Sequence, residues 1–200
     1  MNEIEKLIQE LCPDGVEYRR LGEVACYAKN RIDSCNLNFN NYVSVENLLK
    51  DKKGKKDAEN IPSGQLIRFQ EGDILIGNIR PYLKKIWMAN CQGGTNGDVL
   101  CIRIFHKKII IPKYLYYVLS SNSFFDYDDS HAKGGKMPRG DKQAVLSYPI
   151  PLPPITIQEK IVEILDKFTS LEAELEAELE ARKSQYEYYR NKLLDFNGEM

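Results

Sequence analysis

The chain has 200 residues, of which 42% are hydrophobic and 28% are charged, and its formal net charge is −1. These values are typical of a folded soluble protein, and the length suits one domain with an appendage or two small domains. Met1 begins a polar, charged segment, so we expect neither a signal peptide nor a membrane span. The five cysteines form no C-x-x-C pair, which favours small buried thiols in a reducing cytoplasm over a zinc site.

The charge is unevenly distributed along the chain. Residues 157–200 contain six basic and eleven acidic residues, a net charge of −5, and the preceding residues carry +4. This asymmetry favours a body that binds an anion and a tail that binds something else. A well-solvated acidic coiled coil explains the same numbers, so charge alone leaves both interpretations open.

The first 154 residues predict a mixed α/β body. Helical spacing of apolar residues predicts a helix over residues 2–11, and Pro112 is expected to open a second helix over residues 113–121. The segment 93–97 (G-G-T-N-G) is typical of a tight turn, and we expect a polar loop over residues 126–139. Short apolar stretches predict strands at residues 65–69, 73–79, 83–89 and 99–105, and four prolines predict extended chain over residues 145–152.

One long amphipathic helix is predicted after Pro154, over residues 155–197. Thr156 and Glu159 form a capping-box pattern at its start. A helix of this length exceeds the size of a body of about 150 residues, so we expect it to pair with another helix rather than to fold back. The predicted pairing positions are Phe168, Leu171, Leu175, Leu179, Arg182, Tyr186, Tyr189 and Leu193.

The sequence offers little support for catalysis. It contains neither a G-x-S-x-G elbow nor a P-loop, and no N-P-P-Y or D-P-P-Y run of an adenine methyltransferase. Asp126, Asp128 and Asp129 lie near His131, but a solvated turn explains this polar cluster better than a metal site. We therefore predict no catalytic residue, no metal and no cofactor.

Nucleic-acid binding has more support. Basic side chains lie among amides, hydroxyls and glycines, a mixture that can neutralise phosphates and contact base edges. The best single segment is K-G-G-K-M-P-R at residues 133–139, where glycines allow the backbone to approach a phosphate. The predicted DNA-binding residues are Asn78, Arg80, Lys84, Lys85, Thr95, Asn96, Lys133, Gly134, Gly135, Lys136 and Arg139. A basic run at residues 50–56 is equally well explained as a solvated loop.

Several segments, in order, resemble the specificity subunits of type I restriction–modification systems. The resemblance is carried by residues 12–24, 42–47, 72–81, 133–161 and 185–196. It implies an α+β fold in which a globular target recognition domain, residues 1–154, precedes a coiled-coil-forming spacer helix, residues 155–197. It also implies that methyl transfer and DNA cleavage belong to partner methyltransferase and restriction subunits.

Chains of this family usually contain two recognition domains and two spacer helices, whereas this sequence contains one of each. It therefore resembles a half subunit: a natural half-length product, a truncated gene or an expressed fragment. Two copies would pair antiparallel helices and direct the partner subunits to a bipartite site on double-stranded DNA. A structural adaptor, whose coiled coil is functional and whose body binds protein, is the alternative from a different class.

Overall fold

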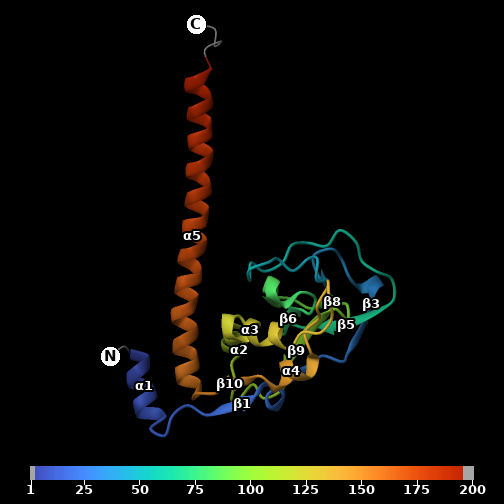
Figure 1. Cartoon of the computed structure of the whole chain (residues 1–200), viewed down its shortest axis with the longest axis vertical. Helices are drawn as coiled ribbons and strands as arrows, with labels where there is room; N and C mark the ends of the chain where they lie inside the picture. The colour runs from blue at the N-terminus through green and yellow to red at the C-terminus, as the bar shows by residue number, and fades with distance from the viewer. Residues whose placement is uncertain (1–2, 196–200) are drawn as a thin grey trace. The chain divides into compact units, whose positions relative to one another are not determined.

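The computed structural model describes residues 3–195, which fall into two compact units divided between Glu159 and Lys160. The first unit is a mixed α/β body and the second is the greater part of one long helix, α5 (Figure 1). The predicted fold class, an α+β body followed by a long C-terminal helix, is confirmed. The last two residues of the predicted helix, 196 and 197, lie outside the described residues. Within the described chain, no helix is both long enough and apolar enough to span a membrane.

Three sheets organise the body. A two-stranded sheet pairs β1 with β10, and one four-stranded sheet has the order β2-β9-β6-β7, antiparallel throughout. The other has the order β3-β5-β8-β4, in which β4 and β8 are parallel. The strands are β1 (Tyr18–Arg20), β2 (Ala25–Tyr27), β3 (Arg31–Asp33), β4 (Tyr42–Val43), β5 (Gln65–Phe69), β6 (Ile74–Gly77), β7 (Ile86–Met88), β8 (Gly93–Thr95), β9 (Val99–Ile104) and β10 (Pro149–Pro151).

Helices connect and flank these strands. The α-helices are α1 (Glu3–Leu11), α2 (Pro112–Leu119), α3 (Asn122–Ser130), α4 (Lys142–Ser147) and α5 (Ile155–Leu194). The short 3₁₀ helices are η1 (Leu21–Glu23), η2 (Ser34–Asn36) and η3 (Pro81–Leu83). The helices predicted from the apolar periodicity of residues 2–11 and from the proline at position 112 correspond to α1 and α2.

The two four-stranded sheets share a core. Val43 and Phe69 of one sheet pack in the same buried cluster as Leu75 and Cys101 of the other. The rings of Phe69 and Trp87 meet edge to face at a centroid distance of 5.8 Å. Burying these side chains removes apolar surface from water, which is the main stabilisation of such a small body.

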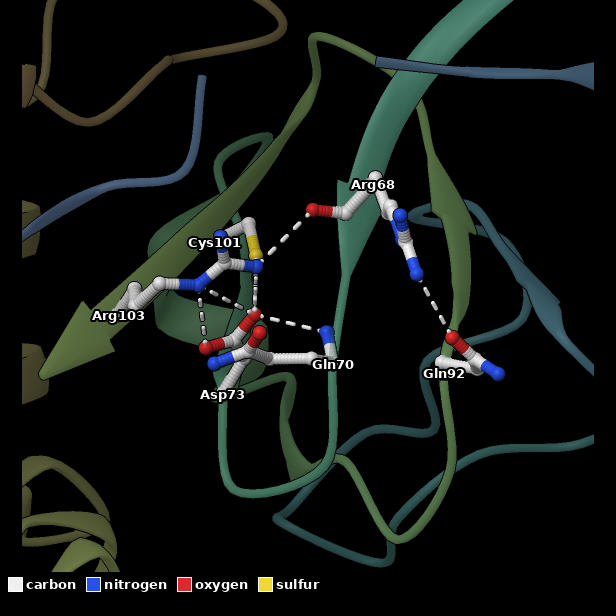
Figure 2. Close-up of polar contacts among 6 residues, drawn as sticks. All are labelled: Arg68, Gln70, Asp73, Gln92, Cys101 and Arg103. Carbon is white, nitrogen blue, oxygen red and sulfur yellow. Dashed lines mark hydrogen bonds and ion pairs between the residues drawn. The ribbon is translucent and has the colours of Figure 1, made fainter. Parts of the chain in front are cut away.

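A buried ion pair between the start of β6 and β9 also reaches the other four-stranded sheet (Figure 2). Asp73, only 2% exposed, accepts bonds from Nε and Nη2 of Arg103, the shorter being 2.6 Å. The same Nη2 donates to the carbonyl oxygen of Arg68 on β5 at 3.2 Å, while Arg103 belongs to β9. Because a buried carboxylate needs charged partners, Asp73 holds the guanidinium of Arg103 in place, and the bond from Arg103 to Arg68 links the two sheets.

The glycine-rich segment 93–97 differs from its prediction. Gly93–Thr95 form the buried strand β8, and residues 96–98 lead into a different sheet rather than back along the same one. A Cβ on Gly93 would lie 1.9 Å from the carbonyl oxygen of Asn41 and 2.5 Å from the ring of Phe69. The glycine is thus required by close approach of neighbouring backbone, not by a hairpin turn.

Two segments predicted as loop or extended chain are partly helical. Residues 126–130 belong to α3, whose N-cap Ser121 accepts a bond from the amide of Phe124 at 3.1 Å. Residues 145–147 belong to α4, where Asp141 caps the first turn by accepting from the amide of Gln143 at 2.8 Å. Only the prolines of β10 make the expected extended chain.

The start of α5 is fixed to the body by a glutamine. The helix begins at Ile155 with Thr156 inside it, and the carbonyl of Pro154 accepts from the amide of Ile157 at 2.9 Å. The predicted capping role of Thr156 was therefore wrong. Fully buried Gln158 accepts from the amide of Ile111 and donates to two carbonyls, each bond 2.8–2.9 Å long. The first helical turn therefore belongs to the body.

The cysteines are free, but the expectation that all are buried was wrong. Cys101 is buried, Cys12 and Cys91 are half-buried, and Cys26 and Cys35 are exposed. No disulfide is present among the described residues.

Candidate nucleic-acid interface

The end of β6 leaves the core and begins the candidate interface. The amide of Asn78 donates to the carbonyl of Asp98 at 2.9 Å, which fixes this end against the start of β9. Two residues later the backbone of Arg80 turns into the left-handed region, with φ 55° and ψ 68°. Its amide donates to the carbonyl of Pro138 at 2.8 Å, so the turn is held by the basic segment 133–139.

The basic segment 133–139 is a closed loop docked onto that turn. Lys133 and Arg139 exchange two backbone bonds of 2.8 Å, and Gly134 has φ +106°, which favours glycine. Arg139 also forms a bridge with Ile79, and the amide of Gly140 donates to the carbonyl of Asn78 at 3.0 Å. The structure thereby brings together two sequence segments that were predicted separately to bind DNA.

A groove of about 420 Å³ opens beside this junction. Its walls come from the segment after β4, from the β6–β7 connection, from the β8–β9 connection and from the docked loop. Among the predicted DNA-binding residues, Arg80, Lys85 and Asn96 line the groove, and Asp98 and Met137 lie beside them. The described arrangement therefore gathers the predicted basic and amide side chains from two of these segments, the β6–β7 and β8–β9 connections, onto one concave surface.

Charges in the groove are only partly compensated. The ammonium of Lys85 donates to the carbonyl of Val45 at 2.5 Å, and burial lowers its pKa, with Lys50 and Lys56 adding to the effect. Arg80 Nε is buried and has no hydrogen-bond partner within residues 3–195. A buried guanidinium nitrogen without an acceptor favours an anionic or carbonyl ligand at this place.

Backbone strain concentrates at the same junction. Throughout the described chain, the non-glycine residues with positive φ are Asp51, Lys52, Arg80 and Lys84, with φ between 50° and 64°. Asp51 donates its amide to the carbonyl of Leu83 at 3.1 Å, and Lys52 donates to that of Lys84 at 3.0 Å. Left-handed conformations cost roughly 1–2 kcal/mol for such residues, and strain of this kind clusters at functional sites. The basic run at residues 50–56 is therefore joined through its backbone to the turn after β6.

The other predicted residues lie in varied surroundings. Thr95 is fully buried and donates to the carbonyl of Val43 at 2.6 Å, so we leave it out of the interface. Lys84 extends its ammonium to Asn122 at the start of α3, at 2.9 Å. Lys133 pairs with Asp141, whereas Gly134, Gly135 and Lys136 are exposed on the loop. Arg139 pairs with Asp98 at 3.0 Å across the groove edge.

A buried carboxyl lies beneath the junction. Asp128 on α3 is fully buried, and burial raises its pKa to about 6. Its oxygens and Oδ1 of buried Asn78 have no hydrogen-bond partner in the described part of the chain. Both side chains crowd Gly140: a Cβ there would lie 2.4 Å from Asp128 Oδ1 and 2.9 Å from Asn78 Oδ1. Only glycine therefore fits at position 140, where the end of the docked loop passes close to Asn78 and Asp128.

The acidic segment at residues 126–131 was predicted as a solvated turn, and this prediction was wrong for Asp128, which is buried. Asp126 and Asp129 are exposed, as predicted, but Asp128 faces inward from α3 because Phe124 and Phe125 are buried on that helix. His131 contacts Ser130 Oγ at 3.0 Å and the carbonyl of Tyr127 at 2.8 Å through Nδ1. Across residues 3–195, no group of histidine, cysteine and acidic side chains could hold a metal ion.

The long helix α5 presents a second candidate interface. Large apolar side chains stay exposed along it, including Phe168 at 65%, Leu175 at 65% and Leu193 at 74%. The remaining predicted pairing positions, Leu171, Leu179, Tyr186 and Tyr189, are 51–66% exposed. Arg182 lies among them and pairs with Glu178 at 3.6 Å. So much apolar surface on a single helix is unusual for a soluble protein without a partner.

Comparison with known proteins agrees with this arrangement. The type I restriction modification DNA specificity domain matches residues 13–181. The Escherichia coli type I restriction enzyme EcoR124I/EcoR124II specificity subunit is 38% identical over 105 residues, which are 50% of this chain and 26% of that protein. The match therefore spans about a quarter of that relative's length.

Solved structures show the same fold. The HsdS subunit from Thermoanaerobacter tengcongensis superposes with a TM-score of 0.62 at 24% identity, covering 91% of this chain and 47% of that one. A structure from a study of complex assembly and conformational transition of the type I R-M system gives a TM-score of 0.66 at 19% identity, covering 96% and 51%. The family match covers most of the chain, so the protein belongs to the type I restriction–modification DNA specificity domain family.

Proposed function

We propose that this chain reads one half of a bipartite DNA site for a type I restriction–modification complex. The body would contact double-stranded DNA, and α5 would pair with a second copy and set the distance between two bodies. The chain itself would be non-catalytic, since methylation and cleavage require partner subunits. The proposal rests on the one body and one long helix that the described residues contain.

The observation that supports DNA reading most strongly is the junction at the groove. Arg80 and Lys85 from the β6–β7 connection and Asn96 from the β8–β9 connection line one concave surface next to the exposed Lys136 and Arg139. Arginine and asparagine form paired hydrogen bonds with guanine and adenine edges, while lysine neutralises phosphates. A surface with both kinds of group suits sequence-dependent contact with a duplex.

The proposed partners follow from α5. A helix of 40 residues is about 60 Å long at 1.5 Å per residue. Two antiparallel copies related by a twofold axis would bury the exposed apolar side chains and hold two bodies apart along one duplex. Methyltransferase subunits would then act on the site that the two bodies select, and restriction subunits would join through them.

Salt dependence of duplex binding tests the proposal against the adaptor alternative. We expect the logarithm of the binding constant to fall linearly with the logarithm of the salt concentration, because each phosphate contact releases counterions. Fluorescence anisotropy with a labelled duplex, from 50 to 200 mM salt as in typical measurements of this kind, provides the slope. Absence of duplex binding at low salt would favour an adaptor whose body binds protein.

A further inference from the structure

The groove beside the docked loop is lined by two acidic side chains, Glu46 and Asp98, which differ in their surroundings. Asp98 pairs with Arg139 at 3.0 Å. Glu46, in the segment after β4, is exposed, and its carboxylate has neither an ion pair nor a hydrogen bond within residues 3–195. A carboxylate on a DNA-binding surface repels phosphates, so it weakens general binding unless it contacts another kind of group.

The backbone that carries Glu46 is a fixed turn. Oδ1 of buried Asn47 accepts from the amide and from the hydroxyl of Ser44, at 2.9 and 2.7 Å. The hydroxyl of Ser44 accepts from the amide of Glu46 at 3.2 Å. The ammonium of Lys85 donates to the carbonyl of Val45, which ties the turn to the β6–β7 connection. Glu46 therefore has a defined place in the groove wall.

Arg80 is the basic counterpart of Glu46 on the β6–β7 connection. Its side chain donates to no residue of the described chain, and its Nε is buried without an acceptor. Burial and Lys50 lower the pKa of Lys85, whereas Glu46 raises it, so the charge of Glu46 acts on the connection that carries Arg80. One groove thus contains a carboxylate and a guanidinium that are not paired with each other.

The two unpaired groups have opposite hydrogen-bonding character. A guanidinium only donates, and a carboxylate only accepts. In the major groove of DNA, guanine offers the acceptors O6 and N7, and cytosine offers the N4 amino group as a donor. Thymine instead offers the acceptor O4, which a carboxylate repels. A donor-only group and an acceptor-only group in one groove therefore match a G·C pair better than an A·T pair.

We propose that Arg80 and Glu46 read one G·C base pair of the half-site, with the guanidinium on guanine and the carboxylate on the N4 amino group of cytosine. The inference deepens the proposed function and rests on DNA binding at this groove. Glu46 would increase specificity and lower general affinity, because it accepts from cytosine and repels phosphates. The preferred half-site should therefore contain a G·C position that depends on both residues.

Selection from a pool of randomised duplexes, followed by sequencing, tests this dependence. Arg80→Ala and Glu46→Ala should each relax the preference at the same G·C position and leave the other positions unchanged. Glu46→Ala should also bind unrelated duplexes about twofold more tightly or better, since a repulsive charge is gone. Glu71→Ala removes an exposed carboxylate at the β5–β6 turn, outside the groove. It is the matched control and should change neither property.

Base analogues locate each contact. Replacing the guanine of this position by 7-deazaguanine removes its N7 acceptor, which should weaken binding of the parent chain by about fivefold or more and leave Arg80→Ala unaffected. Changing the pair to A·T should weaken the parent chain by about tenfold or more, and Glu46→Ala by a smaller factor. Hypoxanthine in place of guanine removes only a minor-groove amino group and should leave binding unchanged.

The outcomes separate this inference from the proposed function. A chain that binds no duplex at low salt would overturn both. Salt-dependent duplex binding without a G·C position that depends on both residues would overturn the base-pair reading and leave DNA binding standing. So would a parent chain that is insensitive to 7-deazaguanine at every guanine, a measurement that needs no variant to fold. Relaxation of one G·C position in both variants, with sensitivity to 7-deazaguanine lost in Arg80→Ala, supports the reading.

Discussion

The amide of Lys52 donates to the carbonyl of Lys84 at 3.0 Å, and both residues have left-handed backbone, with φ 64° and 50°. The bond joins the basic run at residues 50–56 to the turn after β6, so two strained segments support each other. The surrounding structure maintains this strain next to the groove that is proposed to bind DNA.

Replacing Lys84 by glycine should leave the protein more stable than replacing it by alanine. Both changes remove the bond to Asn122, so the difference isolates the left-handed backbone. Glycine adopts this conformation without the Cβ clash, and we expect a difference of about 1 kcal/mol in the free energy of unfolding. Urea denaturation of the two variants measures it, and equal stabilities would show that position 84 is unstrained.

Asp128→Asn should remove a pH dependence of stability. The folded-state pKa of Asp128 is about 6, above its ordinary value of 3.8. The folded protein therefore binds more protons between these values, and the free energy of unfolding falls as pH rises through this window. The asparagine amide stays neutral at every pH. At pH 8 the free energy of unfolding of the variant should therefore exceed that of the parent protein by on the order of 1–3 kcal/mol.

The comparison at two pH values makes that prediction specific. At a pH about one unit below 3.8 the carboxyl of Asp128 is largely protonated in both states, so the advantage of the asparagine variant should largely vanish there. Asp141 adds to the raised pKa of Asp128, but it stays charged throughout the window, because Lys133 and two backbone amides lower its own pKa to about 2. A variant that is less stable than the parent protein at pH 8 would show that the buried carboxylate has a compensating partner.

Lys136→Ala and Arg139→Ala should weaken binding to all duplexes. Each lost phosphate contact should lower the salt slope by about one, without changing which sequence is preferred. Lys107→Ala, which removes one charge outside the groove, is the matched control. Slopes that stay unchanged in both loop variants would remove the loop at residues 133–139 from the interface.

Arg80→Ala should change sequence preference as well as affinity. If its guanidinium contacts a base edge, the loss should be about 1–3 kcal/mol on the preferred sequence and smaller on others. Competition between randomised duplexes, followed by sequencing of the bound fraction, measures the preference. An unchanged preference with a lower salt slope would assign Arg80 to phosphate contact.

Leu175→Glu should break the proposed dimer and leave the body folded. Leu175 lies in the middle of α5 and is 65% exposed, so the change affects the pairing face rather than the body core. Ala173→Glu adds the same charge about 200° around the helix and should be tolerated. Sedimentation measures the mass, and a dimer that persists in Leu175→Glu would contradict pairing through this face.

Local pattern predicted much of the fold but not its long-range contacts. The strand at residues 65–69 and the helix after Pro112 followed from apolar spacing and helix-start chemistry. The segment 126–130 is polar in sequence, and its helix exists because Phe124, Phe125 and Asp128 pack inward. No spacing rule reveals which of three neighbouring aspartates the folded chain will bury.

The interface was predicted in pieces. Basic loops around Arg80 and Lys136 were identified from composition, but the bridge between Ile79 and Arg139 that unites them is a long-range contact. Glycines in the sequence indicated strained turns, whereas nothing in the sequence indicated the positive φ angles of Lys52 and Lys84. Thr95 was predicted to bind DNA because of its hydroxyl. In the structure this hydroxyl is buried and donates to the carbonyl of Val43 on a neighbouring strand.

The central claim is that two copies, held by antiparallel helices, select one site. Sequencing of DNA methylated by this chain with methyltransferase subunits tests it most directly. Identical half-readers related by a twofold axis must read inverted copies of one half-site, so the methylated motif should be palindromic and bipartite. Deleting two heptads from α5 should shorten the gap, since fourteen residues are about 21 Å of helix, and should leave the half-sites unchanged. A non-palindromic motif, or methylation by the purified chain alone, would contradict the account.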